Sequence, residues 1–498
     1  MIIALFIRHV IELRAEPDPK TRPANAAEAV TGLVLHDTMD VIARQIAVPL
    51  VVLAEEGRTT NFRLVYSFAE SETVRQDILS IRRAFQDQLH VTLPAVNDRT
   101  VPASCEIIVG STKRDACREL MASLGEDEYA IRVIADNPEQ SVQVLIAYNG
   151  SYARMAALDR FIKEYILGGK AVVPGNLDIR DRCSAEDVVI TSSIPRLRDP
   201  FILVDEGNYY AYGSGWECWK NSSGSLSGEW EPLGVVVEAP GDADGSFWAP
   251  EVYRFGNQYY LFTTYHSLRC GFRGVSVFRA DRPEGPFREI SAGILTPSWK
   301  NSIDGTLYLD RAGEPWMVFV DEWITAEEGV GRVDAAKLNE SLTEFITQPT
   351  ELFRADAAGW ATSYVADGCW MYQCETGELL ALWSNTEPIG YAVGIARSES
   401  GALEGPWVHD DKPLYSIGLT GDYDGGHPMT FTSLDGQLYL AIHSPNWETE
   451  GRQEKPVFIP LREANGTLVW DIWKGPNDPL WAIYQQILTG NFHSDSAS

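Results

Sequence analysis

Tryptophan is absent from the first 215 residues of the chain, whereas all 15 tryptophans lie between Trp216 and Trp481. A change this abrupt predicts two parts with different packing, which a length of 498 residues allows. We expect the boundary within residues 169–195, where glycines, a proline and a Thr-Ser-Ser run interrupt the apolar pattern. The predicted division is a domain at 58–168, a linker at 169–195 and a second domain at 196–480. Residues 1–57 stay unassigned and 481–498 form a polar tail.

Basic residues are scarce, with 41 Lys and Arg against 70 Asp and Glu and a net charge of −29. This balance argues against nucleic-acid binding, which needs clustered Lys and Arg. A long apolar run is also lacking. The apolar stretch 1–7 is too short to span a membrane, and no basic residue or small-residue cleavage site marks it as a signal peptide. We therefore expect a cytoplasmic protein without a membrane partner.

The seven cysteines lack the paired spacing of a zinc site, and Cys369 and Cys374 are five residues apart. Reduced thiols in a cytoplasmic protein are the expected state. The sequence predicts no required cofactor.

The first part alternates strands and helices. Strands are expected at 61–69, 105–110, 129–134 and 142–147, and helices at 70–89, 114–124 and 151–166, with a further helix near 38–47. This order predicts a small α/β sandwich with helices on one face. The order, together with the strand ending Val109-Gly110-Ser111-Thr112-Lys113-Arg114, resembles the small α/β accessory domain of family 20 hexosaminidases and α-glucuronidases. No acid–base pair is evident in this part.

The second part repeats one short pattern five times, a glycine turn followed by an aromatic-rich strand. The turn glycines are 49 to 64 residues apart, near the size of a four-stranded sheet with its loops: Gly207, Gly256, Gly313, Gly377 and Gly436. Repetition on this scale predicts an all-β five-bladed β-propeller, in which the blades meet around a central channel.

Four ionisable residues precede these glycines by 8 to 10 positions: Asp199, Asp304, Asp367 and His427. A residue that opens the innermost strand of a blade points towards the channel, so four blades offer such a group at one level. Converging carboxylates suit glycosidic cleavage, which needs one group to protonate the leaving oxygen and another to activate water. Aspartates also begin strands for local reasons, but the shared register favours a functional set.

Several short motifs in the second part occur in the order of one family. They are Arg198-Asp199-Pro200-Phe201, Trp248-Ala249-Pro250-Glu251, Ser302-Ile303-Asp304-Gly305, Ala396-Arg397-Ser398 with Gly405-Pro406-Trp407, and Gly426-His427. In combination they resemble glycoside hydrolase family 43, five-bladed propellers that act on arabinose- and xylose-containing glycans. The resemblance implies an inverting enzyme with Asp199 as general base and Asp304 as the carboxylate that orients the acid and tunes its pKa. It also implies that His427 lies at the channel axis, where a calcium or sodium ion can be held through water.

The expected general acid departs from the family pattern. The family places a Glu in a Glu-Gly-Pro context on the fourth blade, whereas this chain has Asp367-Gly368-Cys369. The shorter arm changes the reach by about 1.5 Å, one carbon–carbon bond. An Asp can still donate a proton if burial or a neighbouring carboxylate raises its pKa. We therefore expect Asp367 to be the acid, with Glu322 and Glu251 as the next candidates.

Further residues are expected to bind the substrate: Arg198, Phe247, Trp248, Glu251, Trp370, Arg397 and His427. Trp248 is expected beside the channel, where its ring can stack on a sugar. Arg397 either hydrogen-bonds sugar hydroxyls or pairs with a carboxylate of its own blade.

The predicted function is an inverting, exo-acting α-L-arabinofuranosidase or β-D-xylosidase on plant-derived oligosaccharides. A β-D-galactofuranosidase or other furanosidase is an alternative, because the sequence does not identify the sugar. A retaining β-fructosidase fits less well, since it needs Asn-Asp-Pro and Glu-Cys motifs and this chain has Arg-Asp-Pro and Cys374-Glu375. A catalytically impaired sugar-binding propeller remains the alternative from another class. The oligomeric state is not indicated.

Overall fold

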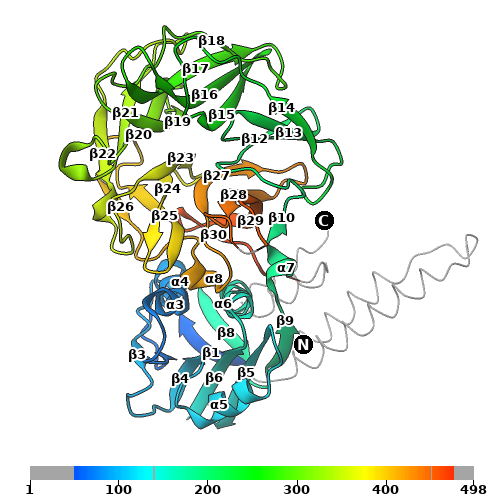
Figure 1. Ribbon diagram of the computed structural model, residues 1–498. Helices are drawn as coiled ribbons and strands as arrows, with labels where there is room; N and C mark the ends of the chain where they lie inside the picture. Colours follow the sequence, from blue (N-terminus) through cyan, green and yellow to red (C-terminus); the bar gives the residue numbers. More distant parts are fainter. Residues whose placement is uncertain (1–49, 138–140, 450, 476–498) are drawn as a thin grey trace, which may run out of the picture.

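The structure, a computed structural model, describes residues 50–137, 141–449 and 451–475 (Figure 1). The helix expected near 38–47 and the tail expected at 481–498 lie outside these ranges. Strands dominate the chain. None of the helices in the described ranges is both long and apolar enough to cross a membrane. In Figure 1 an α/β part, blue to cyan, lies below a β-rich part that runs from green to red.

The α/β part contains, among its described residues, a six-stranded sheet of order β3-β2-β4-β6-β5-β9. The first four of these strands are parallel to one another. At the edge, β5 is antiparallel to β6, and β9 is antiparallel to β5. The bounds are β2 (Arg63–Tyr66), β3 (Ala95–Asn97), β4 (Cys105–Val109), β5 (Glu128–Asn137), β6 (Ser141–Tyr148) and β9 (Asp178–Arg182).

Helices cover both faces of this sheet. On one face, α5 (Asp115–Ala122) packs against Ile108 and Leu145. On the other, α4 (Ser80–Leu89) and α6 (Ser151–Tyr165) pack against Ile107 and Ile146. Successive residues of a strand point to opposite faces, so the apolar runs of β4 and β6 bury both sides. The expectation of helices on one face is therefore wrong.

The helix expected over 70–89 is divided in two. α3 (Glu72–Ile78) begins after Ser71, whose side chain accepts a hydrogen bond from the Val74 amide, and α4 follows Leu79. Ser71 is thus an ordinary N-cap, which satisfies one of the free amides of the first turn.

Residues 169–195 are not a plain linker. They form β8 (Lys170–Pro174), β9, α7 (Ala185–Val188) and β10 (Ile190–Thr191). β8 lies between β1 (Leu50–Glu55) and β7 (Ile166–Leu167), so part of the unassigned segment 1–57 also belongs to the α/β part. β10 pairs with β29 near the other end of the chain. The change from one part to the other therefore occurs around α7.

The β-rich part forms, in the residues described, five antiparallel sheets in chain order. Four of them have four strands each: β11 (Phe201–Asp205), β12 (Asn208–Gly213), β13 (Glu217–Asn221), β14 (Glu231–Val235); β15 (Trp248–Phe255), β16 (Gln258–Ser267), β17 (Phe272–Ala280), β18 (Arg288–Glu289); β19 (Ser302–Leu309), β20 (Pro315–Asp321), β21 (Arg332–Lys337), β22 (Thr350–Arg354); β23 (Asp367–Gln373), β24 (Leu379–Glu387), β25 (Gly390–Ser398), β26 (Trp407–His409). The last sheet joins β27 (Gly426–Thr432), β28 (Leu438–Ser444), β29 (Lys455–Ala464) and β30 (Thr467–Trp470) with β10.

The first strands of these sheets contact one another in a closed ring. β11 contacts β15, β15 contacts β19, β19 contacts β23, β23 contacts β27, and β27 contacts β11. Each of the five predicted turn glycines lies between the first and second strand of its sheet and has a φ between 58° and 108°. The predicted turns are therefore confirmed. Glycine is needed there because it adopts a positive φ without strain.

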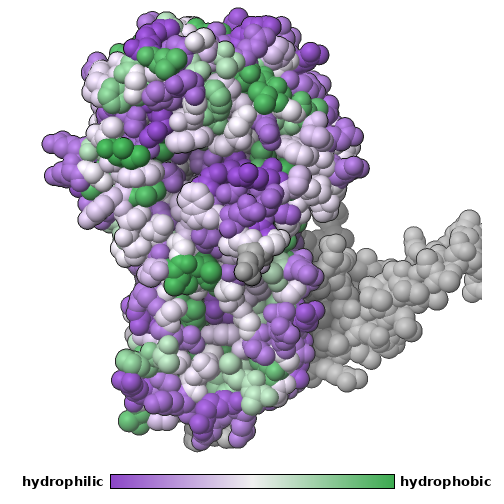
Figure 2. Space-filling model, in the orientation of Figure 1, coloured by the Kyte–Doolittle hydropathy of each residue, from purple (hydrophilic) through white to green (hydrophobic). Residues whose placement is uncertain are grey.

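The α/β part packs against the fourth and fifth sheets. Asp77 of α3 is buried and pairs with Arg154 of α6 and with Lys412. Arg154 also donates to the backbone oxygen of Leu419 in α8 (Ile417–Thr420). On the face shown in Figure 2, hydrophilic side chains cover most of both parts, and the hydrophobic ones occur in small separate groups.

Candidate active site

One residue at the start of each first strand adopts a left-handed backbone conformation. These residues, with φ between 44° and 57°, are Asp199, Ala249, Asp304, Gly368 and His427. Strand pairing shifts at this position in the second to fifth sheets, as a β-bulge does. Positive φ in non-glycine residues costs free energy and is concentrated at functional sites. The five positions thus form one structural level around the ring.

Asp367 does not lie at this level. Gly368 occupies the left-handed position of the fourth sheet, and a Cβ there would lie 2.8 Å from the His427 ring. Asp367 precedes it, as Arg198 and Trp248 precede the left-handed residues of the first two sheets. The sequence register that put Asp367 level with Asp199 is therefore wrong by one residue.

The amide N–H of each left-handed residue donates a hydrogen bond to a side chain. Four of the acceptors stand at one position of the second strand, or just after it, in the preceding sheet. The bonds are Asp199 to His443 Nδ1 (3.3 Å), Ala249 to Ser214 Oγ (3.0 Å), Asp304 to Thr264 Oγ1 (3.0 Å) and His427 to Ser384 Oγ (2.9 Å). Thr264, Ser384 and His443 each pair, in their own sheet, with the residue before the left-handed position. The Ser214 N–H donates a hydrogen bond to the backbone oxygen of Arg198, which gives Ser214 the same place in the first sheet.

The third sheet breaks this pattern. Its equivalent position is Val320, paired with Ile303, and a valine side chain cannot accept a hydrogen bond. The Gly368 amide donates instead to Oδ2 of Asp304, at 2.9 Å. Asp304 therefore contacts the backbone next to Asp367 directly.

Asp199 is held as a carboxylate. The Ser214 hydroxyl donates to its Oδ2, and the Arg198 Nε lies 3.6 Å from its Oδ1. Burial alone would raise the pKa of Asp199, but polar surroundings that include the Arg198 guanidinium and the Ser214 hydroxyl outweigh it and hold the pKa below its ordinary value. Asp199 can therefore accept a proton.

Asp304 and Asp367 have the opposite tendency. Burial raises the pKa of both, and the negative charge of Asp304 raises that of Asp367 further. Two neighbouring buried carboxyls cannot both ionise easily. Each carboxyl also accepts one hydrogen bond that favours its charged form, Asp304 from the Gly368 N–H and Asp367 from the Tyr391 hydroxyl, so the two carboxyls share one proton.

His427, at the inner end of the fifth sheet, faces Asp199 and Asp304. Its Nδ1 lies 3.5 Å from Asp199 Oδ1 and 3.9 Å from Asp304 Oδ2. Burial lowers the pKa of His427, so the imidazole is neutral at neutral pH. Within the described ranges, no three His, Cys, Asp or Glu side chains are grouped as direct metal ligands. The residues therefore do not fit a directly ligated ion, and an ion held through water stays a prediction.

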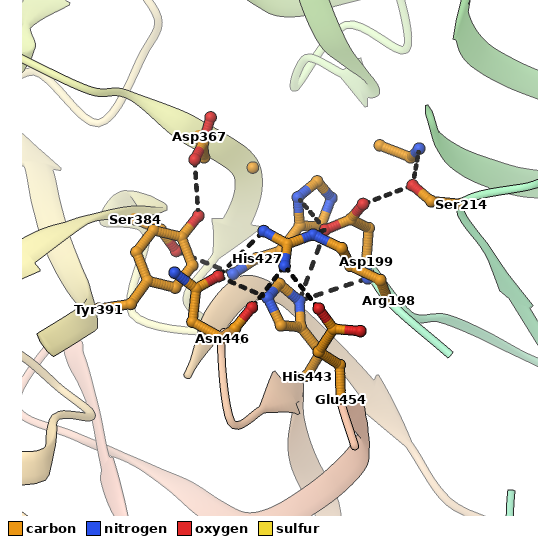
Figure 3. A network of polar contacts seen from close by, with 12 residues as sticks. Arg198, Asp199, Ser214, Asp367, Ser384, Tyr391, His427, His443, Asn446 and Glu454 are labelled. Carbon is orange, nitrogen blue, oxygen red and sulfur yellow. Dashed lines mark hydrogen bonds and ion pairs between the residues drawn. The ribbon is translucent and has the colours of Figure 1, made fainter. Parts of the chain in front are cut away.

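Arg198 connects Asp199 to the loop after β28 (Figure 3). Its guanidinium donates to the side-chain and backbone oxygens of Asn446, at 2.9 and 2.5 Å, and lies 3.4 Å from Glu454. It also lies 4.9 Å from the ring centroid of Trp447, which is 69% exposed. Trp447 therefore presents a free aromatic surface next to the site.

Trp248 presents a second aromatic surface. It is 38% exposed, and the Arg273 guanidinium lies 5.1 Å from its ring centroid. The neighbouring Phe247 packs on Trp216 at a centroid distance of 4.3 Å. Trp248 therefore remains the stronger candidate for sugar stacking of the two.

Trp370 and Arg397 are committed to other contacts. Trp370 packs against Phe201 and Tyr253, and its Nε1 donates to Thr430 Oγ1. Arg397, on the third strand of its sheet, donates to Asp410 and lines a cavity against α4 and α6. The interpretation of Arg397 as a sugar ligand is wrong, since it does not join the aspartates.

The two reserve candidates for the acid have different partners. Glu322 forms an ion pair with Arg273 through both of its carboxylate oxygens. Glu251 is buried and accepts a hydrogen bond from the Tyr253 hydroxyl. Burial raises the pKa of Glu251 to about 8, so it is protonated at neutral pH.

Three residues of the site were not predicted from the sequence: Ser214, Tyr391 and His443. Tyr391 Oη donates to Asp367 Oδ2 at 2.9 Å, and His443 Nε2 lies 3.2 Å from Asn446 Oδ1. These residues lie on or beside second and third strands and belong to no recognised motif. Only the repeat of one acceptor per sheet could have found Ser214 and His443.

Known proteins match the β-rich part. The family model described as glycosyl hydrolases family 43 matches residues 190–459. A solved structure, the endo-arabinase from Bacteroides thetaiotaomicron VPI-5482, is 35% identical and covers 56% of this chain and 99% of that chain, with a TM-score of 0.50.

Two curated relatives match over shorter stretches. The probable arabinan endo-1,5-alpha-L-arabinosidase B of Aspergillus fumigatus is 26% identical over 145 residues, 26% of this chain and 38% of the relative. The probable arabinan endo-1,5-alpha-L-arabinosidase A of Aspergillus oryzae is 24% identical over 185 residues, 36% of this chain and 54% of the relative. The chain therefore spans only 38% and 54% of the lengths of these relatives.

Proposed function

The chain belongs to glycosyl hydrolase family 43, and from this premise we propose that it hydrolyses α-L-arabinofuranosyl linkages of plant-derived oligosaccharides with inversion. The observation that carries the proposal is the meeting of Asp199, Asp304 and the residue after Asp367 at the centre of the ring of first strands. We further propose that the five sheets are the blades of a propeller and that the α/β part is an accessory domain.

The proposed reaction uses two carboxyl groups on opposite sides of the sugar. Asp199, ionised, takes a proton from water as the water oxygen bonds to the anomeric carbon. Asp367, protonated, gives its proton to the leaving oxygen as the glycosidic bond breaks. Asp304 stays charged, which keeps the proton on Asp367. Inversion requires the carboxyls of Asp199 and Asp367 to be roughly 6.5–9.5 Å apart, to leave room for water.

We propose an arabinoside substrate and not a xyloside because the similar proteins named above are arabinanases. The exposed rings of Trp248 and Trp447 support the binding of more than one sugar ring, since apolar sugar faces suit aromatic platforms. Xylosides and galactofuranosides remain the alternative substrates.

The test is a panel of nitrophenyl α-L-arabinofuranoside, β-D-xyloside and β-D-galactofuranoside, together with linear arabino-oligosaccharides. Proton NMR gives the anomeric configuration of fresh product, and product lengths distinguish release of single residues from internal cleavage. We expect arabinoside turnover with inversion. Binding of arabino-oligosaccharides without any hydrolysis would overturn the proposal and favour a sugar-binding protein.

A further inference from the structure

Tyr391 lies on β25, the third strand of the fourth sheet, yet its hydroxyl points towards Asp367 (Figure 3). We propose that Tyr391 is a positioning residue that determines which oxygen of Asp367 carries the catalytic proton. This inference rests on the proposed function, because it assigns the proton that Asp367 would donate.

The hydrogen bond itself selects the oxygen. Tyr391 Oη donates to Oδ2 of Asp367 at 2.9 Å, so Oδ2 is occupied as an acceptor. A protonated carboxyl carries its hydrogen on one oxygen and accepts on the other. The proton of Asp367 therefore resides on Oδ1, the oxygen that remains available to a leaving group.

The surroundings hold the phenol in place. Tyr391 is 4% exposed, and its ring is stacked on that of His443 at a centroid distance of 6.0 Å and an interplanar angle of 26°. The backbone N–H of Tyr391 donates a hydrogen bond to Asp424 Oδ2. The other oxygen of this carboxylate, Oδ1, accepts a hydrogen bond from the backbone N–H of Asn446. One carboxylate thus ties the strand of Tyr391 to the loop that binds Arg198.

The fifth sheet makes room for this ring. The residue before the left-handed position carries a side chain in the other sheets, namely Arg198, Trp248, Ile303 and Asp367, but is Gly426 here. A Cβ at Gly426 would lie 2.2 Å from a ring carbon of Tyr391. The Tyr391 ring therefore occupies the space of the missing side chain.

The arrangement also accounts for an aspartate where the family pattern has a glutamate. A glutamate would carry its carboxyl about 1.5 Å further from the backbone, one carbon–carbon bond. It could not keep the bond to a phenol fixed by Gly426, His443 and Asp424 without bending. The short arm and Tyr391 form a matched pair.

The test replaces Tyr391 by Phe, which keeps the ring and removes the hydroxyl. Tyr372→Phe is the matched control, because Tyr372 on β23 of the same sheet donates to another carboxylate, Glu463, at 2.7 Å. Rates are measured against pH on an arabino-oligosaccharide and on a dinitrophenyl arabinofuranoside, whose leaving group needs no proton.

For Tyr391→Phe we expect kcat on the oligosaccharide to fall about 10- to 100-fold, as for a catalytic group misplaced by roughly 1 Å. The dinitrophenyl rate should change less than about threefold and so show that the site is folded. A donor to a carboxylate favours its charged form, so losing it raises the pKa of Asp367. The basic limb of kcat/KM on the oligosaccharide therefore moves to higher pH, whereas Tyr372→Phe leaves it unchanged.

Three results would overturn the inference. They are equal losses on both substrates, a basic limb that does not move, and a Tyr391→Phe enzyme that behaves like Tyr372→Phe. If the wild-type protein hydrolysed neither substrate, the proposed function would fall first and this assignment with it.

Discussion

The amide of Gly368 donates a hydrogen bond to Asp304 Oδ2 at 2.9 Å and so joins the third sheet to the fourth. At the other four junctions of the ring, an uncharged serine, threonine or histidine side chain accepts the equivalent bond. Here the acceptor is a carboxylate, which brings a negative charge next to Asp367. The departure from the repeat is thus what couples the two carboxyls.

Val320→Thr tests this coupling. Thr has nearly the shape of Val and restores the hydroxyl found at the equivalent positions Thr264 and Ser384. We expect the new Oγ1 to compete for the Gly368 amide and free Asp304 Oδ2, with a loss of kcat of about 10-fold, the effect of losing roughly one ordinary hydrogen bond.

The measurement is kcat on an arabino-oligosaccharide, with Val318→Thr as the control. Val318 is also buried on β20, two residues away, but pairs with Thr306 and not with Ile303. Equal losses in the two variants would mean that the valine matters only for packing.

Asp199→Ala should abolish turnover and retain the fold. Water loses its base, and general base catalysis contributes about 10²- to 10⁴-fold. The measurement is kcat on every active substrate of the panel, with circular dichroism as the check on folding. A folded variant with near wild-type rates would remove Asp199 from the mechanism.

Asp367→Ala should discriminate between leaving groups. A dinitrophenol departs without a proton, so its arabinoside should keep a measurable rate, whereas oligosaccharide cleavage falls by about 10²- to 10⁴-fold. The basic limb of the pH profile should disappear, because it reports the deprotonation of the acid. Asp367→Glu should also lose activity, since the longer arm does not match Tyr391. A gain with Glu would indicate a decayed site instead.

Glu251→Gln should change how stability depends on pH. The native pKa of Glu251 is raised by burial to about 8, above the ordinary value of 4.5 that applies in the unfolded chain. Below pH 4.5 both states are protonated. Between pH 4.5 and 8 only the unfolded state ionises, so stability falls as pH rises, by roughly 3–5 kcal/mol in all.

Thermal melts at pH 5 and pH 8 measure this effect. The wild-type protein should lose more stability between the two values than Glu251→Gln, which keeps an oxygen for the Tyr253 hydroxyl. An identical loss in both proteins would contradict a protonated Glu251 in the native state.

Local patterns in the sequence determined much of this protein. The glycine turns follow from backbone conformation, and the apolar pattern predicted four strands of the first part, which correspond to β2, β4, β5 and β6. The motifs around Asp199 and Asp304 predicted the family and two members of the site. These features depend on residues close together in the chain, which a sequence records directly.

The tertiary structure alone decided the rest. In the fourth sheet the left-handed conformation falls on Gly368, so Asp367 lies one residue before the level that Asp199, Asp304 and His427 share. Tyr391 and His443 reach the site from second and third strands, and Arg397, on a third strand too, faces away from it. In the sequence, Tyr391 is 24 positions from Asp367, and His443 is 244 positions from Asp199. Whether they meet depends on how the sheets close around the ring, and that is set by packing between strands remote in the chain.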